Sequence, residues 1–254
     1  MKQIPNLFTL LNLFFGCLAV IVTMQSGIEL SVTDTGSQLM NMPEQIYLAS
    51  LFIGLAAVVD FFDGFIARLL KASSAMGREL DSLADVVSFG VAPGLIIYQF
   101  LRLSVATEEN GLDASIWWLL PALVLPCASA YRLAKFNIDN SQTYSFKGVP
   151  TPAVGLVVAS LPLIFWHATQ PWLLNLLLNK WAWYAMVALL SYLMVSNIPI
   201  MGLKFRDYSI RNNIPKLTLL LISVVLVLLF RWTAIPIIFI TYIILSLLLK
   251  KKTA

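Results

Sequence analysis

Residues 60–85 read DFFDGFIARLLKASSAMGRELDSLAD and determine how the rest of the chain is interpreted. Two apolar segments meet at the short polar stretch in the middle, and each carries a pair of aspartates close to that junction. Asp60 and Asp63 lie on the first segment, and Asp81 and Asp85 lie on the second. Spacings of three and four residues place each pair on one helical face, so the sequence predicts four carboxylates converging between two antiparallel neighbouring helices.

The composition around this stretch indicates a membrane protein. Of 254 residues, 59% are hydrophobic and only 12% are charged, and the mean hydropathy is +0.83. Soluble domains carry about a quarter charged residues, so a chain with half that fraction is typical of a protein embedded in the bilayer. We expect an integral protein of the cell inner or plasma membrane, in contact with membrane lipids and without a nucleic-acid partner.

Apolar segments of spanning length, about 20 residues, recur along the whole chain. They lie near 5–24, 46–70, 78–101, 116–136, 151–169, 181–200, 214–230 and 234–249. As one helix the last two would be about 54 Å long, far more than the hydrocarbon core, and Arg231-Trp232-Thr233 interrupts them. The sequence therefore predicts an all-α polytopic helix bundle of about eight spans that ends in a tight hairpin.

The positive charges predict the orientation of this bundle. If the N-terminus is cytoplasmic, only Arg102, Lys180 and Arg231 of the 17 basic residues face outward, and the other 14 face the cytoplasm. Short cytoplasmic loops carry an excess of lysine and arginine. Both termini are therefore expected in the cytoplasm, and the aspartates of residues 60–85 are expected near the cytoplasmic surface.

Carboxylates at this depth need compensating positive charge. Ionisable side chains inside spanning segments cost about 2.5–3.5 kcal/mol each and mark function by default. Asp63 and Asp85 lie about 10 Å from the predicted helix ends, and the nearby Arg68 and Arg78 cannot neutralise four charges. Oxygen ligands suit Mg²⁺ or Mn²⁺. The pattern therefore predicts a site for two divalent ions, which is a known solution for phosphoryl chemistry.

The carboxylates belong to a longer pattern that resembles a known family. It reads Asp60-x2-Asp63-Gly64-x2-Ala67-Arg68-x8-Gly77-x3-Asp81-x3-Asp85. This resembles the complete motif of the CDP-alcohol phosphotransferases, with eight positions matching at the required gaps. The resemblance implies a six-helix core over about residues 1–200, with residues 201–254 adding a transmembrane hairpin and a basic tail. It also implies a homodimer.

The resemblance assigns roles to individual residues. It implies that Asp60, Asp63 and Asp81 are metal ligands, and that Asp85 contributes to the metal site and acts as the base for the acceptor hydroxyl. The residues it implies for CDP binding are Gly64, Ala67, Arg68 and Gly77. At the cytoplasmic start of the first helix, Asn6 and Thr9 are further candidates for contact with the diphosphate, or alternatively cap that helix.

Three further blocks resemble the phosphatidylserine synthases of bacteria and archaea within this family. They are Ile4–Asn12, Asp81–Pro93, and Arg132–Asn137 followed by Phe146–Ala153. The resemblance implies transfer of a phosphatidyl group from CDP-diacylglycerol to L-serine, giving phosphatidylserine and CMP. Lys135 stands where arginine is expected, which keeps a charge but not a bidentate grip.

The acceptor site is predicted from these blocks and from the charge of serine. Its carboxylate needs a cation or several N–H donors. The candidate residues for the acceptor or a phosphate are Ser88, Arg132, Lys135, Asn137 and Lys147. For the cations among them, anchoring on the cytoplasmic side is an equal alternative.

Two alternative functions remain open from the sequence. Within the family, the acceptor could be glycerol 3-phosphate or inositol phosphate, or the donor an archaeal ether lipid. From another class, intramembrane carboxylates also serve cation or proton transporters. A transporter predicts carboxylates distributed through the membrane depth and inverted repeats, whereas here the aspartates gather at one depth and no repeat is visible.

Overall fold

The computed structural model describes residues 3–32, 38–70, 74–108, 115–139, 145–202 and 210–250. These residues form the expected all-α bundle, with two short antiparallel strand pairs added. The helices are α1 (Ile4–Gln25), α2 (Ile46–Leu69), α3 (Ala75–Val86), α4 (Ala92–Ala106), α5 (Val124–Ile138), α6 (Thr151–His167), α7 (Pro171–Leu177), α8 (Lys180–Val195), α9 (Ile210–Phe230) and α10 (Ala234–Lys250). The strands are β1 (Glu29–Val32), β2 (Gln38–Asn41), β3 (Ser145–Lys147) and β4 (Pro199–Met201).

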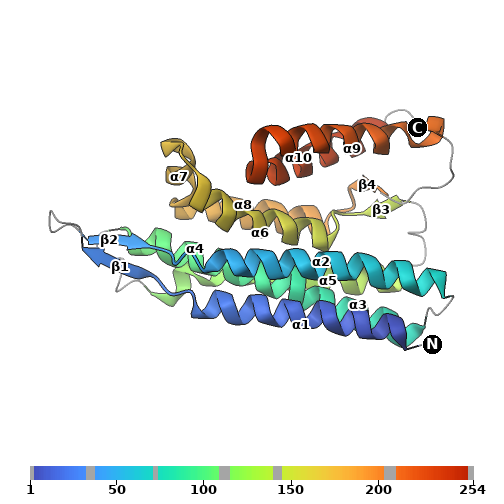
Figure 1. Cartoon of the computed structure of the whole chain (residues 1–254), viewed down its shortest axis with the longest axis horizontal. Coiled ribbons are helices and arrows are strands. Elements are labelled where there is room, and N and C mark those ends of the chain that lie inside the picture. The colour runs from blue at the N-terminus through green and yellow to red at the C-terminus, as the bar shows by residue number, and fades with distance from the viewer. Residues whose placement is uncertain are drawn as a thin grey trace.

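The helices are arranged in three tiers (Figure 1). The first tier holds α1 to α5, in which α1 packs along α2 and α3. The second holds α6 to α8, with α6 against α2 and α8 against α5. The third is the pair α9 and α10, of which α10 contacts α6. The start of α1 and the end of α10 lie at the same end of the bundle (Figure 1).

Each of the eight predicted segments contains an observed helix. By length and apolar composition, four helical stretches of the described residues qualify as membrane spans: Ile4–Gln25, Ile46–Leu69, Ala75–Ala106 and Asn213–Leu248. The bent pair of α7 and α8 supplies a fifth. The remaining two segments contain α5 and α6, whose 15 and 17 residues are fewer than the about 20 that a span requires by itself.

The C-terminal stretch is the predicted hairpin. A 3₁₀ turn at Arg231–Thr233 separates α9 from α10, and the two helices pack against each other. Arg231 adopts the left-handed conformation, with φ of 50°, which is uncommon for residues other than glycine. The interruption recognised in the sequence is therefore where the chain reverses.

The third predicted segment lies in one long helical stretch in which a π-helical turn separates two α-helices. The side chain of Ser74 caps its start by accepting the Gly77 N–H at 2.9 Å. A π-helical turn, Val87–Val91, then joins α3 to α4. Single π-helical turns are rare overall, and those that occur are often found at functional sites. This one begins two residues after Asp85.

Small residues allow the helices around the π-helical turn to approach closely. A Cβ at Gly16 of α1 would overlap Ser88, and one at Gly155 of α6 would be 2.9 Å from Phe89 Cβ. Close approach at small residues is how membrane helices pack. The turn is therefore enclosed by α1 on one side and α6 on the other, and the end of α3 is held in place.

Candidate active site

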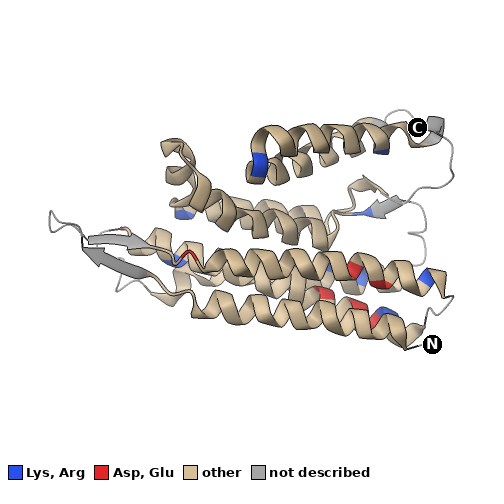
Figure 2. Ribbon diagram, viewed as in Figure 1, with Lys and Arg blue, Asp and Glu red and all other residues tan. Residues whose placement is uncertain are grey.

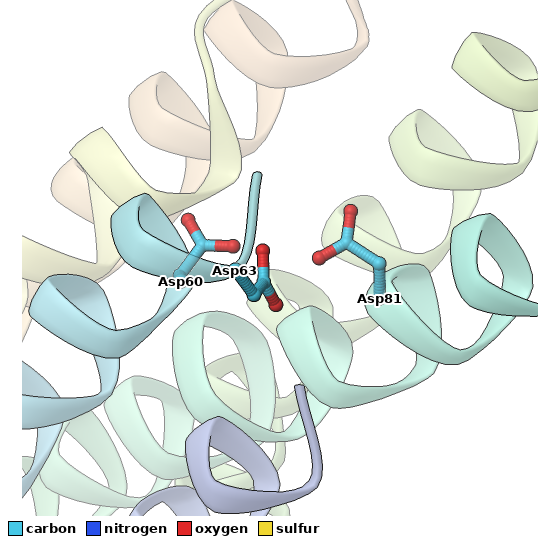
Figure 3. Close-up of side chains that lie close together, drawn as sticks. All are labelled: Asp60, Asp63 and Asp81. Carbon is cyan, nitrogen blue, oxygen red and sulfur yellow. The ribbon is translucent and has the colours of Figure 1, made fainter. Parts of the chain in front are cut away.

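Three of the four predicted carboxylates meet at one point. Asp60 and Asp63 on α2 and Asp81 on α3 each offer an oxygen, and these oxygens lie within 4.8 Å of one another. The three side chains point toward one another (Figure 3). The aspartates and glutamates of α2 and α3 lie toward the end of the bundle where α1 begins (Figure 2).

The packing of the two helices differs from the prediction in one respect. We expected α2 and α3 to be neighbours packed against each other, but the main packing partner of each is α1. The carboxylates therefore meet across the start of α1. This packing could not be predicted, because the short connection between α2 and α3 is equally compatible with both arrangements.

Helix α1 supplies hydrogen bonds to two of the aspartates. Thr9 Oγ1 donates to Asp63 Oδ2 at 2.7 Å, and Asn12 Nδ2 donates to Asp85 Oδ1 at 3.2 Å. Both aspartates are 6% exposed. A buried carboxylate needs such donors, so α1 fixes the orientation of both carboxyl groups.

The residues present fit divalent metal ions. Asp81 Oδ1 is buried and has no hydrogen-bond partner among the described residues. Neither of the two ion pairs found among those residues, Lys147–Asp139 and Lys180–Glu108, involves the carboxylates. A group of oxygen ligands without a paired cation is what Mg²⁺ and Mn²⁺ prefer.

A cavity of about 540 Å³ opens beside the carboxylates. Its size falls in the range of small-molecule sites. Its walls are Pro5, Asn6, Thr9, Asp63, Gly64, Ala67, Arg68, Ser74, Ala75, Gly77, Arg78 and Asp81. All six residues predicted to bind the nucleotide are among them, so the structure brings these positions of α1, α2 and α3 together.

At one position of this cavity wall, Gly77, an added side chain would be crowded. A Cβ at Gly77 would lie 3.1 Å from both Asn6 Oδ1 and Ser74 Oγ. Asn6 is held by its own bond, in which Nδ2 donates to Gln3 Oε1 at 2.9 Å. A side chain at position 77 would thus press against the wall that Asn6 and Ser74 form.

Asp85 lies outside the group of three and faces a buried arginine. It is one helical turn beyond Asp81 and interacts electrostatically with Arg132 of α5. The Arg132 side chain is only 8% exposed and donates from an Nη to Thr151 Oγ1 at 3.0 Å. Its Nε is buried without a partner among the described residues, so one donor of the guanidinium is left without a hydrogen bond.

The other predicted acceptor residues have protein partners. Lys135 Nζ donates to Asn197 Oδ1 at 2.8 Å, and Lys147 pairs with Asp139 at 2.9 Å. Asn137 Nδ2 donates to Ser82 Oγ at 2.9 Å and to Glu79 Oε2 at 3.4 Å. Ser88 is fully buried, and its hydroxyl donates to the Asn12 carbonyl at 3.1 Å. Of this set, Arg132 has an unpartnered Nε and lies within electrostatic range of one of the carboxylates, Asp85.

Asn12 and Thr151 were not predicted as partners of the site residues. Asn12 ends the block Ile4–Asn12, and an amide in an apolar helix is a signal of a buried polar contact. Thr151, the partner of Arg132, begins α6 and gave no such signal, because threonine is common at helix starts.

Known proteins are similar in sequence to the part of the chain that contains the site. A family model described as CDP-alcohol phosphatidyltransferase matches residues 2–190. The CDP-diacylglycerol–serine O-phosphatidyltransferase of Bacillus subtilis is 35% identical over 171 residues, covering 65% of this chain and 78% of the relative. The protein of the same name from Helicobacter pylori is 30% identical over 227 residues, covering 88% and 81%. That of Saccharomyces cerevisiae is 34% identical over 168 residues, covering 63% and 53%.

Proposed function

Because the chain belongs to the CDP-alcohol phosphatidyltransferase family, we propose that it transfers the phosphatidyl group of CDP-diacylglycerol to L-serine and releases CMP. The observation that carries this proposal is the meeting of Asp60, Asp63 and Asp81 beside a cavity whose walls include Gly64, Ala67, Arg68 and Gly77 of the same motif. Serine is proposed as acceptor because relatives that cover most of this chain carry that activity in their names.

The carboxylates are proposed to hold two divalent ions, Mg²⁺ or Mn²⁺, with Asp60, Asp63 and Asp81 as ligands and Asp85 contributing. Such ions supply charge stabilisation to phosphate oxygens and to a departing phosphate. The protein's own part is to orient the ligands. Thr9 and Asn12 do this for Asp63 and Asp85 through the hydrogen bonds described above.

The cavity is proposed to hold the CDP part of the donor. Arg68 and Arg78 at its wall carry positive charge for the diphosphate, and Gly64 and Gly77 allow the ligand to approach the backbone. The acyl chains would remain in the bilayer. Asn6 lines the same wall and adds polar groups for the nucleotide.

Asp85 is proposed as the base. It accepts the proton of the serine hydroxyl as the serine oxygen bonds to the phosphorus next to diacylglycerol, and the bond from that phosphorus to the oxygen of CMP breaks. Direct displacement is preferred because, in the described part of the chain, no serine, cysteine or histidine lines the cavity in contact with a base. Ser74, which does line it, caps α3.

Arg132 is proposed to bind the carboxylate of serine. A guanidinium offers planar donors that match a carboxylate. Arg132 is buried near Asp85 and has an unpartnered Nε. The bound acceptor would therefore present its hydroxyl between the arginine and the proposed base.

The site is proposed to face the cytoplasm. The distribution of basic residues in the sequence supports this orientation, as does the position of the aspartates toward the bundle end where α1 begins and α10 ends (Figure 2). We also propose that the chain divides into a core of residues 1–200 and a C-terminal part of residues 201–254. We further propose that it forms a homodimer, which light scattering of the detergent-solubilised protein would test.

Release of CMP by the purified protein tests the proposed reaction. The assay uses CDP-diacylglycerol in detergent, with and without L-serine and with and without Mg²⁺ or Mn²⁺. We expect release that requires both serine and a metal, with phosphatidylserine as the lipid product. Release only with glycerol 3-phosphate or inositol phosphate would change the acceptor, and release only from an ether-linked donor would change the lipid. The absence of release with every alcohol would contradict the proposal.

A further inference from the structure

The last helix, α10, makes side-chain hydrogen bonds to a strand near the site. The Tyr242 hydroxyl donates to the Met201 carbonyl at 2.8 Å, and the Met201 N–H donates to Ser246 Oγ at 3.2 Å. Tyr242 is 6% exposed and Ser246 is 4% exposed. Two side chains one helical turn apart therefore bind both backbone polar groups of one residue of β4. All three residues lie beyond residue 190, where the match to the family ends.

Strand β4, which these hydrogen bonds hold against α10, is in turn paired with the segment that precedes α6. It pairs with β3, with Ser145 opposite Met201. After β3, the N–H groups of Gly148 and Val149 donate to backbone carbonyls near the end of α8, at 2.8 Å and 3.0 Å. Gly148 has φ of 78°, and a Cβ there would overlap the Met194 carbonyl. The backbone of this segment is thus held by hydrogen bonds at both Gly148 and Val149.

The segment leads directly to the buried arginine. Helix α6 begins at Thr151, which is fully buried and whose hydroxyl accepts the bond from Arg132. The oxygen of Tyr242 also lies within electrostatic range of Arg132. The guanidinium therefore bonds Thr151 of α6 and lies within electrostatic range of Asp85 of α3 and Tyr242 of α10.

We propose that Tyr242 and Ser246 are positioning residues for the acceptor site: by binding Met201 they fix, through β3 and Thr151, the guanidinium of Arg132. This inference rests on the proposed function, in which Arg132 binds the carboxylate of serine. It assigns the C-terminal helix pair a role in acceptor affinity. Donor binding should not depend on it, because the cavity for CDP is built from α1, α2 and α3.

Steady-state kinetics of Tyr242→Phe/Ser246→Ala test this role. The double variant keeps the aromatic ring and removes the two hydroxyl groups. We expect the KM for L-serine to rise about three- to tenfold, as for the loss of one or two hydrogen bonds, with the KM for CDP-diacylglycerol unchanged. The matched control is Thr241→Val, because the Thr241 hydroxyl donates only within α10, to the Ile237 carbonyl at 2.8 Å. An unchanged KM for serine, or an equal rise in both KM values, would overturn the inference.

Hydrogen exchange tests the structural link without any substrate. The amides of Gly148, Val149 and Met201 should exchange about three- to tenfold faster in the double variant, and at the wild-type rate in Thr241→Val. Equal exchange in all three proteins would overturn the inference whichever alcohol the enzyme uses. Faster exchange in the double variant, combined with wild-type protein that does not use serine, would support the link and overturn the acceptor instead.

Discussion

The proposed donor side and the proposed acceptor side of the site are built in different ways. The proposed donor side is the cavity beside Asp63 and Asp81, and its walls come from the start of α1, the end of α2 and the start of α3. The proposed acceptor side is the surroundings of Arg132 on α5, which bonds Thr151 of α6 and lies within electrostatic range of Asp85 of α3 and Tyr242 of α10. The donor side is local and the acceptor side is assembled from distant segments, so substitutions on the two sides should affect the two substrates separately.

The largest effect is expected at the proposed metal ligands, on which transfer between the two substrates is proposed to depend. Asp81→Asn removes a charge from the three carboxylates that are proposed to hold the ions. We expect CMP release to fall by at least about 100-fold, as for loss of a group that stabilises transition-state charge. Glu79→Gln is the control, because this exposed residue lies on the same helix outside the cluster. Similar activity in the two variants would mean that the cluster has no part in the reaction.

A second large effect is expected on the acceptor side alone. Arg132→Lys keeps a positive charge and loses the planar fork. We expect kcat/KM for serine to fall about 10- to 100-fold, the range for a hydrogen bond to a charged group, while the KM for CDP-diacylglycerol stays within about twofold. Lys135→Arg is the control, since Lys135 is bonded to Asn197. A larger effect on the donor KM would move Arg132 to the donor side.

The converse effect is expected at the wall of the cavity. Gly77→Ala places a methyl group 3.1 Å from Asn6 Oδ1 and Ser74 Oγ. We expect the KM for CDP-diacylglycerol to rise about fivefold, with the KM for serine unchanged, because crowding of a packed site costs about 1 kcal/mol or more. Gly27→Ala is the control, since a Cβ there has no atom within 4 Å. A wild-type donor KM in Gly77→Ala would show that the nucleotide does not pass this wall.

The smallest effect is expected from a single hydrogen bond to a carboxylate. Thr9→Val removes the donor to Asp63. We expect the metal concentration for half-maximal activity to rise about two- to threefold, because one hydrogen bond that orients Asp63 is lost. Thr23→Val is matched to it, since Thr23 is buried in the same helix and donates to the Ala19 carbonyl at 2.7 Å. Equal metal dependence in both variants would remove Thr9 from the site.

The difference between the two sides also explains what could be predicted. Helical spacing placed Asp60 on one face with Asp63, and polar interruptions of the apolar pattern predicted the breaks at Arg231 and between the two aspartate pairs, since these are local properties of the chain. The pairing of β3 with β4 joins residues more than 50 positions apart, and neither strand is long enough for its sequence pattern to predict the pairing. The hydrogen bond of Tyr242 could not be predicted for the same reason, because a tyrosine in an apolar helix gives no indication of its partner.

The role of α1 is the clearest case of a packing effect that the sequence did not reveal. The helix looked like an apolar span with a polar start. In the structure it lies against both carboxylate-bearing helices, and its Thr9 and Asn12 bond two aspartates. Polar residues recurring along one face of an apolar helix should therefore be considered as partners for ionisable groups elsewhere in the bundle.

Direct measurement of metal binding tests the central claim, that the carboxylates form the metal site of a phosphatidyltransferase. Electron paramagnetic resonance can count Mn²⁺ bound to the purified protein in the presence of CDP-diacylglycerol and without serine. We predict two bound ions per chain, retained in Glu79→Gln and reduced or lost in Asp81→Asn. A wild-type protein that binds no Mn²⁺, or an Asp81→Asn variant that binds as much as the wild type, would contradict the account.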